Sequence, residues 1–149
     1  MRAVAQRVRC CTIRVGDERV GEMGQGLLAL VGVARGDTPA DAEQLASKLV
    51  HLRIFEDEQG RMNHSLLEAG GSLGIVSQFT LLGDCRRGRR PSYADAAPPE
   101  EAERLIELLL ATARSLEVPL ATGRFRAHMG VELTNDGPVT LLLDTRKVF

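Results

Sequence analysis

The sequence has few cysteines. It has three in 149 residues, two of them adjacent at Cys10 and Cys11, and neither a Cys-x-x-Cys pair nor a spaced pair of histidines accompanies them. So few thiols do not make a disulfide framework, and the spacing gives no metal-binding pattern. We expect buried or inert thiols and no metal. Cys85 lies beside arginines, as reactive thiols often do, but no histidine near it in sequence could act as its base. A catalytic Cys85 is therefore the minor alternative.

Long apolar runs and an excess of one charge are also missing. No segment approaches the ~20 apolar residues of a membrane-spanning helix, and residues 1–7 lack the apolar stretch of a signal peptide. The formal net charge is −1, from 19 Lys and Arg against 20 Asp and Glu. We therefore expect a cytoplasmic protein with no membrane partner and no DNA partner, and only a local cluster of arginines suggests contact with nucleic acid.

Length and apolar periodicity predict a single mixed α/β domain over residues 1–149. Two stretches with apolar residues at helical spacing indicate two helices, and each stretch begins with a proline at the first helical position. Two helices do not cover a whole sheet, so we expect a second sheet or a second copy of the chain to bury the rest, with a homodimer favoured. The predicted strands are at about 2–15, 18–23, 27–34 and 74–81, and the helices at 39–52 and 99–116. Residues 119–125 are predicted as a strand or an extended loop, and residues 129–133 and 139–143 as a hairpin.

The end of the apolar run 74–81 is where we look for chemistry. Ser77, Gln78 and Thr80 are short polar groups on what is predicted to be a buried strand. Alternation would place Gln78 and Thr80 on one face of that strand, and Ser77 and Phe79 on the other. The loop that follows carries four arginines, Arg86, Arg87, Arg89 and Arg90. These form either a solvated charged loop or a set of phosphate contacts, because arginine binds phosphate oxygens in a bidentate manner.

Common catalytic motifs are absent. Ser77 has no Gly-x-Ser-x-Gly surroundings, and there is neither a Walker loop nor a complete dinucleotide-binding glycine motif. The three histidines, at 51, 64 and 128, are predicted in a helix, a turn and a strand with no evident relation to Thr80. Residues 135–138, Asn-Asp-Gly-Pro, form a turn in the plainest interpretation. A cis Gly-Pro bond is the alternative, at a base rate of about 5–6% of X-Pro bonds.

Taken together, the two segments are more informative than either alone. Residues 77–81 (Ser-Gln-Phe-Thr-Leu) and 135–140 (Asn-Asp-Gly-Pro-Val-Thr) closely resemble the two signature motifs of the D-aminoacyl-tRNA deacylases, the DTD family. Collinear matches extend over about residues 1–145, including 6–8, 53–55, 90–92 and 122–125. Departures are small: Tyr93 stands where phenylalanine is usual, and the C-terminus extends past the usual end.

The resemblance implies a three-layer, dimeric fold of mixed sheets with two main helices on one face. It also implies hydrolysis of the ester between a D-amino acid, or glycine, and the 3′-terminal adenosine of tRNA, without a cofactor. The site would lie at the dimer interface. There, a cis Gly137-Pro138 peptide would enter the partner's pocket, which is lined by Ser77, Gln78, Phe79 and Thr80. Met129 and Asn135 are further candidate substrate-binding residues, and Arg7 is a candidate support for the Gly-Pro loop.

This mechanism needs no nucleophilic side chain. An aminoacyl ester is already activated, so oriented backbone donors and a positioned water suffice, and the 2′-hydroxyl of the terminal ribose is thought to help activate the water. Two alternatives stay open. One is a hydrolase that uses Thr80 as its nucleophile, and the other is a tRNA-binding module that leaves the ester intact.

Overall fold

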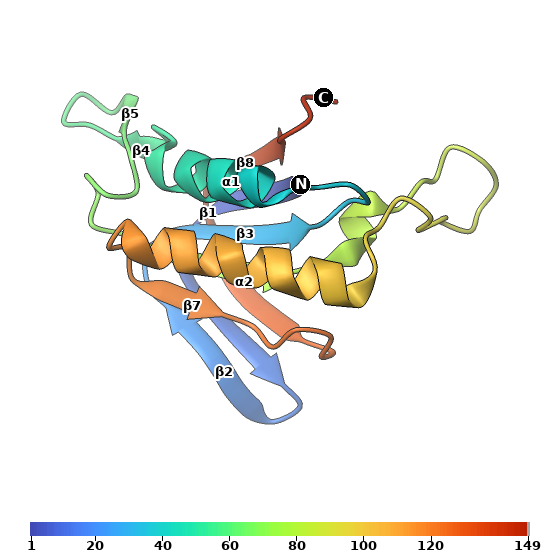
Figure 1. Cartoon of the computed structure of the whole chain (residues 1–149). Coiled ribbons are helices and arrows are strands. Elements are labelled where there is room, and N and C mark those ends of the chain that lie inside the picture. Colours follow the sequence, from blue (N-terminus) through green and yellow to red (C-terminus); the bar gives the residue numbers. More distant parts are fainter. Residues whose placement is uncertain (149) are drawn as a thin grey trace.

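The computed structural model of the chain describes residues 1–148, in which two helices lie against one face of a mixed six-stranded sheet (Figure 1). The strand order is β2-β1-β3-β6-β7, and β8 pairs with the free side of β1. β3, β6 and β7 run parallel and the other pairs are antiparallel. The strands are β1 (Arg2–Val15), β2 (Glu18–Met23), β3 (Gly26–Gly32), β6 (Ser72–Ser77), β7 (Leu120–Thr122) and β8 (Gly130–Asp144), with β4 (Phe55–Glu56) and β5 (Met62–His64) in a separate hairpin.

Helices α1 (Pro39–His51) and α2 (Pro99–Ser115) both begin at a proline, as predicted. Their apolar stripes pack with alternate residues of β1, β3 and β6 into the larger core cluster. At the start of α1, the Thr38 hydroxyl and backbone N–H donate to the Asp41 carboxylate at 2.7 and 2.8 Å. Burial opposes ionisation of Asp41, but hydrogen bonds from Thr145 and Thr38 outweigh it and lower its pKa to about 2. The predicted mixed α/β fold, with two helices on one face, is confirmed. Neither helix, and no other helix within residues 1–148, is long and apolar enough to cross a membrane.

The opposite face of the sheet is only partly covered. The second half of β1 leaves β3 to pair with β2, and β2 returns beside β7, where Gly21 faces Thr122. The curled part encloses a smaller core cluster that includes Val8, Ile13 and Leu28. Nearer the other end of β1, the same face carries three cross-strand neighbours, Val4, Leu30 and Leu142. Val4 and Leu30 are half-buried and Leu142 is 63% exposed, so this apolar area is open to a partner.

The predicted C-terminal hairpin is wrong. Residues 130–144 form one long strand, β8, and both of its halves pair with β1. The pairing is interrupted at two neighbouring places. At the larger one, Gln6 lies opposite Thr140 and Val8 opposite Asn135, so four residues of β8 face Arg7 alone; at the smaller one, Val8 lies opposite Asn135 and Cys10 opposite Thr134. The Gly-Pro segment is therefore a loop that projects from a continuous strand. Alternation on both sides of a turn-forming sequence looks the same for a hairpin and for an interrupted strand.

The predicted strand over residues 74–81 is also wrong in its second half. β6 ends at Ser77, and residues Phe79–Leu82 form a 3₁₀ helix, η1. The predicted sharing of strand faces by Gln78 with Thr80, and by Ser77 with Phe79, therefore does not occur. The turn places Leu82, which is 2% exposed, against Gly32 of β3; a Cβ on Gly32 would lie 2.5 Å from Leu82 Cδ2. Burial of Leu82 therefore accompanies the end of the strand. The apolar run in the sequence does not by itself reveal where the strand ends.

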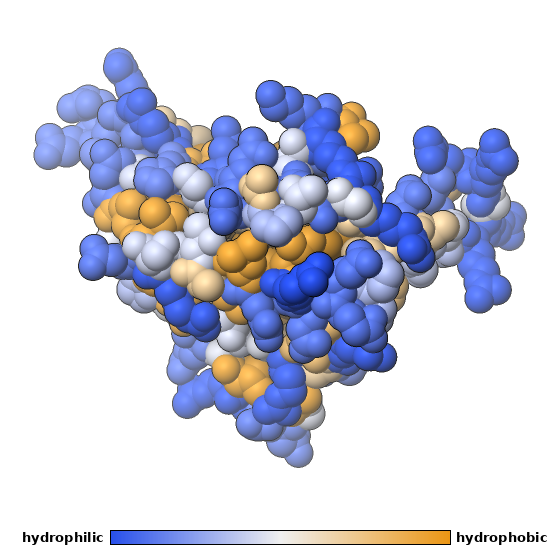
Figure 2. Space-filling view, viewed as in Figure 1, coloured by the Kyte–Doolittle hydropathy of each residue, from blue (hydrophilic) through white to orange (hydrophobic). Residues whose placement is uncertain are grey.

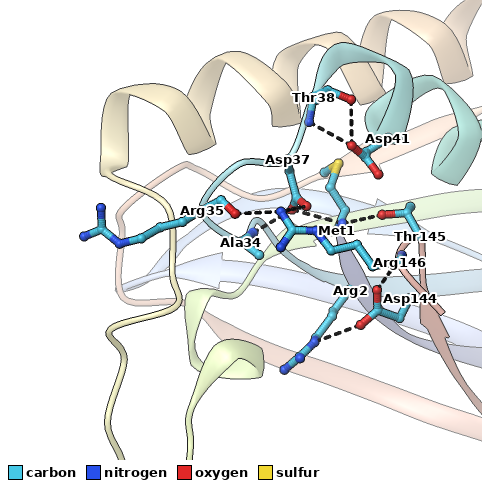
Figure 3. Close-up of polar contacts among 10 residues, drawn as sticks. All are labelled: Met1, Arg2, Ala34, Arg35, Asp37, Thr38, Asp41, Asp144, Thr145 and Arg146. Carbon is cyan, nitrogen blue, oxygen red and sulfur yellow. Dashed lines mark hydrogen bonds and ion pairs between the residues drawn. The ribbon is translucent and has the colours of Figure 1, made fainter. Parts of the chain in front are cut away.

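A buried polar network ties the first residue to the last strand and to the loop before α1 (Figure 3). The amino group of Met1 lies 3.0 Å from Asp37 Oδ2 and 2.6 Å from Thr145 Oγ1, and both partners of the ion pair are 0% exposed. Asp37 Oδ2 also accepts a bond from the Ala34 N–H at 2.6 Å. Arg146 lies 2.8 Å from Asp37 Oδ1 without the alignment of a hydrogen bond, so that contact is an ion pair only.

This network generates a stability prediction. Asp37→Asn should lower the free energy of unfolding by about 3 kcal/mol, because it leaves the buried ammonium group without its counter-charge. Urea denaturation at neutral pH measures the change, and Asp17→Asn in the exposed β1–β2 turn is the matched control. A loss below about 1 kcal/mol for Asp37→Asn would contradict a stabilising role for this buried ion pair.

Candidate active site

The first motif lies where β6 ends and η1 begins. The Gln78 N–H donates to Val31 O at 2.7 Å, which fixes the backbone against β3. The Gln78 side chain donates to Thr80 Oγ1 at 3.0 Å. The Phe79 ring is 59% exposed and meets Tyr93 edge to face, with centroids 5.1 Å apart. Within residues 1–148, no acceptor takes the backbone N–H of Phe79 or Thr80, as is usual in the first turn of a helix. The motif thus presents two backbone donors beside an exposed ring.

A cavity of about 160 Å³ adjoins Ser77 between α2 and the ends of β6 and β7. Its walls combine an aromatic ring and aliphatic side chains with two carboxylates from successive turns of α2. The lining residues are Ile75, Ser77, Glu103, Ile106, Glu107, Leu110, Thr122, Gly123 and Phe125. The sequence offered no reason to predict a role for Glu103 or Glu107. Their spacing, two acidic residues at i and i+4 on a helix, is the only feature that could have indicated one. Met129, predicted to bind substrate, packs against Gly123 and the smaller core cluster beside the cavity.

The second motif forms the loop that interrupts β8. Its Gly137-Pro138 peptide bond is cis, and Gly137 has a φ of +125°, a conformation that favours glycine. Asn135 holds the base of the loop: its amide nitrogen donates to Gln6 Oε1 at 2.8 Å and Thr140 Oγ1 at 3.2 Å, and its oxygen accepts the Val139 N–H at 3.0 Å. The amide of Asn135, which was predicted to contact substrate, therefore forms hydrogen bonds with Gln6 of β1 and with Val139 and Thr140.

Arg7 is the other support of this loop. It is 5% exposed, and its guanidinium donates to Ile54 O at 2.7 Å and to Asp136 O at 3.2 Å. The Glu56 carboxylate, at 3.6 Å, and the Asp136 carboxylate, at 3.4 Å, lie near it. A buried guanidinium needs such partners, because an unpaired one would be costly. The structure thus places Arg7 between the loop and the β4–β5 hairpin, consistent with its predicted supporting role.

The two motifs of one chain are far apart. Arg7, opposite the Gly-Pro loop, pairs with Leu27 and through it with Leu73, four residues before Ser77. Three strand spacings also separate β8 from β6. Standard sheet dimensions therefore put the motifs roughly 13 Å apart along the strands and about 14 Å across them, or about 20 Å in all. The structure does not bring them together within a single copy.

The arginine loop projects from the body at the right of Figures 1 and 2, where its surface is hydrophilic. Paired backbone hydrogen bonds between Asp84 and Ser92 close it. Arg86, also predicted to contact phosphate, forms a bidentate pair with Asp84, and hydrogen bonds from its side chain and backbone lower the pKa of that carboxyl to about 2. The remaining arginines, Arg87, Arg89 and Arg90, are exposed and have no ion pair among the described residues.

Within residues 1–148, no histidine hydrogen-bonds to Thr80, whose hydroxyl instead accepts from Gln78. His51 ends α1 and contacts Ser47, whereas His64 lies in β5 and His128 in the loop before β8. The predicted turn and strand positions of His64 and His128 are therefore wrong. A Ser or Thr nucleophile needs a base within hydrogen-bonding reach.

This fold and these motifs define a small α/β protein whose candidate site is made of backbone groups and has no nucleophile with its base. Residues 4–144 match the family model described as D-Tyr-tRNA(Tyr) deacylase. The chain therefore belongs to this family, and the resemblance seen in its motifs is confirmed.

Curated relatives agree with this assignment, and solved structures share the fold. A D-aminoacyl-tRNA deacylase of Desulforudis audaxviator is 56% identical over all of both chains, and one of a Roseiflexus species is 57% identical over 97% of this chain and 94% of its own. A solved structure named c-Myc DNA Unwinding Element Binding Protein is 36% identical with a TM-score of 0.91, covering 97% of this chain and 99% of its own. Another, named as a probable eukaryotic D-amino acid tRNA deacylase, shares the fold at 18% identity, with a TM-score of 0.80 and coverage of 95% and 97%.

Proposed function

We propose that the protein is a D-aminoacyl-tRNA deacylase, which hydrolyses the ester bond between a D-amino acid and the 3′-terminal adenosine of tRNA. Family membership and the names of full-length relatives support the activity. The observation that carries the site is geometric: two motifs characteristic of the family lie about 20 Å apart in a single chain, whose sheet has one face only partly covered.

A second copy of the chain resolves this separation. A two-fold interface presents the same surface from both copies, so each motif of one copy can face the other motif of its partner. The uncovered apolar side chains of Val4, Leu30 and Leu142 give such an interface its centre. The proposal is a homodimer with two equal sites, each built from η1 of one copy and the Gly137-Pro138 loop of the other.

Catalysis in this site relies on the backbone. The free N–H groups of Phe79 and Thr80 stabilise the oxygen that becomes negative when water attacks the ester. Carbonyl groups of the Gly137-Pro138 loop hold the amino group and leave no room for an L side chain, which is selection by rejection. Glycine has no side chain to reject, so the proposal extends to glycyl-tRNA. The ester itself is activated, and no cofactor is required.

The cavity beside Ser77 suits the terminal adenosine. Phe125 offers a ring for stacking on the base, and the aliphatic walls suit its apolar faces. The Glu103 and Glu107 carboxylates are acceptors for ribose hydroxyls or an amino group. The proposal also keeps residues 1–149 as one domain and places it in the cytoplasm, where aminoacyl-tRNA is used.

The function is tested by the rates of ester hydrolysis of D-tyrosyl-tRNA and L-tyrosyl-tRNA with the purified protein. We expect fast loss of the D-ester while the L-ester stays near its spontaneous rate, because the loop excludes the L side chain. Hydrolysis of neither ester by a folded dimer would favour the tRNA-binding module. Thr80→Ala separates the other rival: it should keep most activity if Thr80 is not the nucleophile, and abolish turnover if it is.

The cross-subunit site predicts complementation between two impaired variants. Gly137→Ala strains the loop, because a Cβ there would lie 2.8 Å from Val139 Cγ2 at a φ of +125°. Phe79→Pro removes one backbone donor at the first position of η1, where proline is tolerated after the extended Gln78. Loss of such a donor costs about 10²–10³ in kcat. Unfolded and refolded as a 1:1 mixture, the two variants should recover about a quarter of wild-type activity, because half the dimers are mixed and each mixed dimer has one intact site.

Phe79→Leu is the control for this experiment, since it removes the ring and keeps the N–H. It should lose far less kcat than Phe79→Pro. A mixture no more active than its separate components would contradict a site shared between subunits.

The three unpaired arginines of the projecting loop are proposed to contact tRNA phosphates. Charge reversal by Arg87→Glu or Arg89→Glu should raise KM for the acyl-tRNA about five- to tenfold and reduce the salt dependence of KM, with kcat little changed. Arg114→Glu, an exposed reversal in the last turn of α2, is the control. If KM and its salt dependence equal those of the control, the loop does not contact tRNA.

A further inference from the structure

The Gly137-Pro138 loop has a third attachment besides Arg7 and Asn135, and it involves the Asp136 side chain. The Asp136 carboxylate is 23% exposed and bonds to Arg9 Nε at 3.0 Å through Oδ1, while its Oδ2 lies 3.4 Å from Arg7 Nε. One carboxylate therefore bridges two guanidinium groups of the neighbouring strand, immediately before the cis peptide.

The backbone of β1 is shaped for this contact. Val8 pairs with Asn135 and Cys10 pairs with Thr134, so Arg9 is an extra residue with no partner on β8. Such a bulge turns a side chain away from its regular direction. The Arg9 side chain is 74% exposed, and its Nε lies 3.0 Å from Oδ1 of Asp136, the carboxylate of the loop.

The three attachments act on different parts of the loop. Asn135 closes its base, and Arg7 fixes the carbonyl of Asp136 from the buried side. Neither of these holds the Asp136 side chain from the solvent side. A charge-assisted hydrogen bond from Arg9 on one side of the carboxylate, and the ion pair with Arg7 on the other, restrict the rotation of the peptide that leads into Gly137. That rotation determines where the carbonyls of the cis turn point.

We infer that Asp136 is a specificity-determining positioning residue, whose carboxylate, held between Arg7 and Arg9, fixes the direction of the Gly137-Pro138 turn. The inference rests on the proposed function, in which the carbonyls of that turn distinguish D from L substrates. A turn that is free to rotate would still enter the partner's pocket, but it would reject an L side chain less sharply.

Amide hydrogen exchange and kinetics of the full-length protein test this together. In Asp136→Ala, the Val139 amide, which bonds to Asn135, should exchange about fivefold faster or more by NMR. The ratio of kcat/KM for D- over L-tyrosyl-tRNA should fall about tenfold, with KM for the D-ester changed less than about twofold. Arg9→Gln should lower the ratio by about threefold, and the double variant should be no worse than Asp136→Ala, because both act through one contact.

Matched controls come from the same two strands. Arg14 and Glu132 form an exposed ion pair of 3.7 Å between β1 and β8, away from the loop. Glu132→Ala and Arg14→Gln should leave both the Val139 exchange and the D/L ratio unchanged.

The failures are distinguishable. If the unaltered protein discriminates D from L and Asp136→Ala does so equally well, the inference is overturned and the proposed function stands. A rise in KM for acyl-tRNA in Arg9→Gln with an unchanged ratio would also overturn it, and would make Arg9 a tRNA contact instead. If the unaltered protein hydrolyses neither ester, the proposed function fails, and the role of Asp136 in selection fails with it.

Discussion

The pairing of β1 with β8 is the constraint on which the rest of the candidate site depends. One residue of β1, Arg7, faces four residues of β8, so the excess chain must leave the sheet as a loop. A loop of that kind is held only if its polar groups find partners, and the buried guanidinium of Arg7 is the partner of the Asp136 carbonyl and carboxylate. Hydrogen bonds to charged groups stabilise a fold by about 1.5–3 kcal/mol each, and an unpaired buried charge is costlier still. Arg7 and the loop therefore require each other.

The same sheet sets the distance between the two motifs. Strand spacing and rise per residue are nearly fixed, so no adjustment of side chains can bring η1 to the Gly-Pro loop across three strands. The open apolar area around Leu142 lies on the face over which Leu82 of η1 also packs, against Gly32. In the proposed dimer, the two-fold interface that buries this face therefore also completes the site.

Residue patterns predicted the regular elements well and the site poorly. Both helices and the first three strands followed from periodicity and prolines, because burial of one face leaves a repeating signal. The two motifs leave no such signal. The chain turns after Ser77, and this turn lets Leu82 pack against Gly32. An apolar run in the sequence does not reveal a tertiary contact of that kind. The interrupted strand around Gly137 alternates on both sides as a hairpin would. The resemblance to a family identified the two motifs but did not separate these alternatives, and it gave no role to the cavity wall at Glu103 and Glu107.

A site made of backbone groups, as proposed, needs neither a nucleophilic side chain nor a base to activate it. Its sequence requirements fall on residues that shape the main chain: Gly137 for a positive φ, Pro138 for the cis bond, and Gly32 for the room that lets η1 form. In the proposed site, side chains that support the loop, such as Arg7 and Asn135, then matter as much as those that line the pocket, because they fix where carbonyl and N–H groups point. In such a protein, activity should depend on backbone direction and hence on the supports behind the loop, rather than on the acidity of any one side chain.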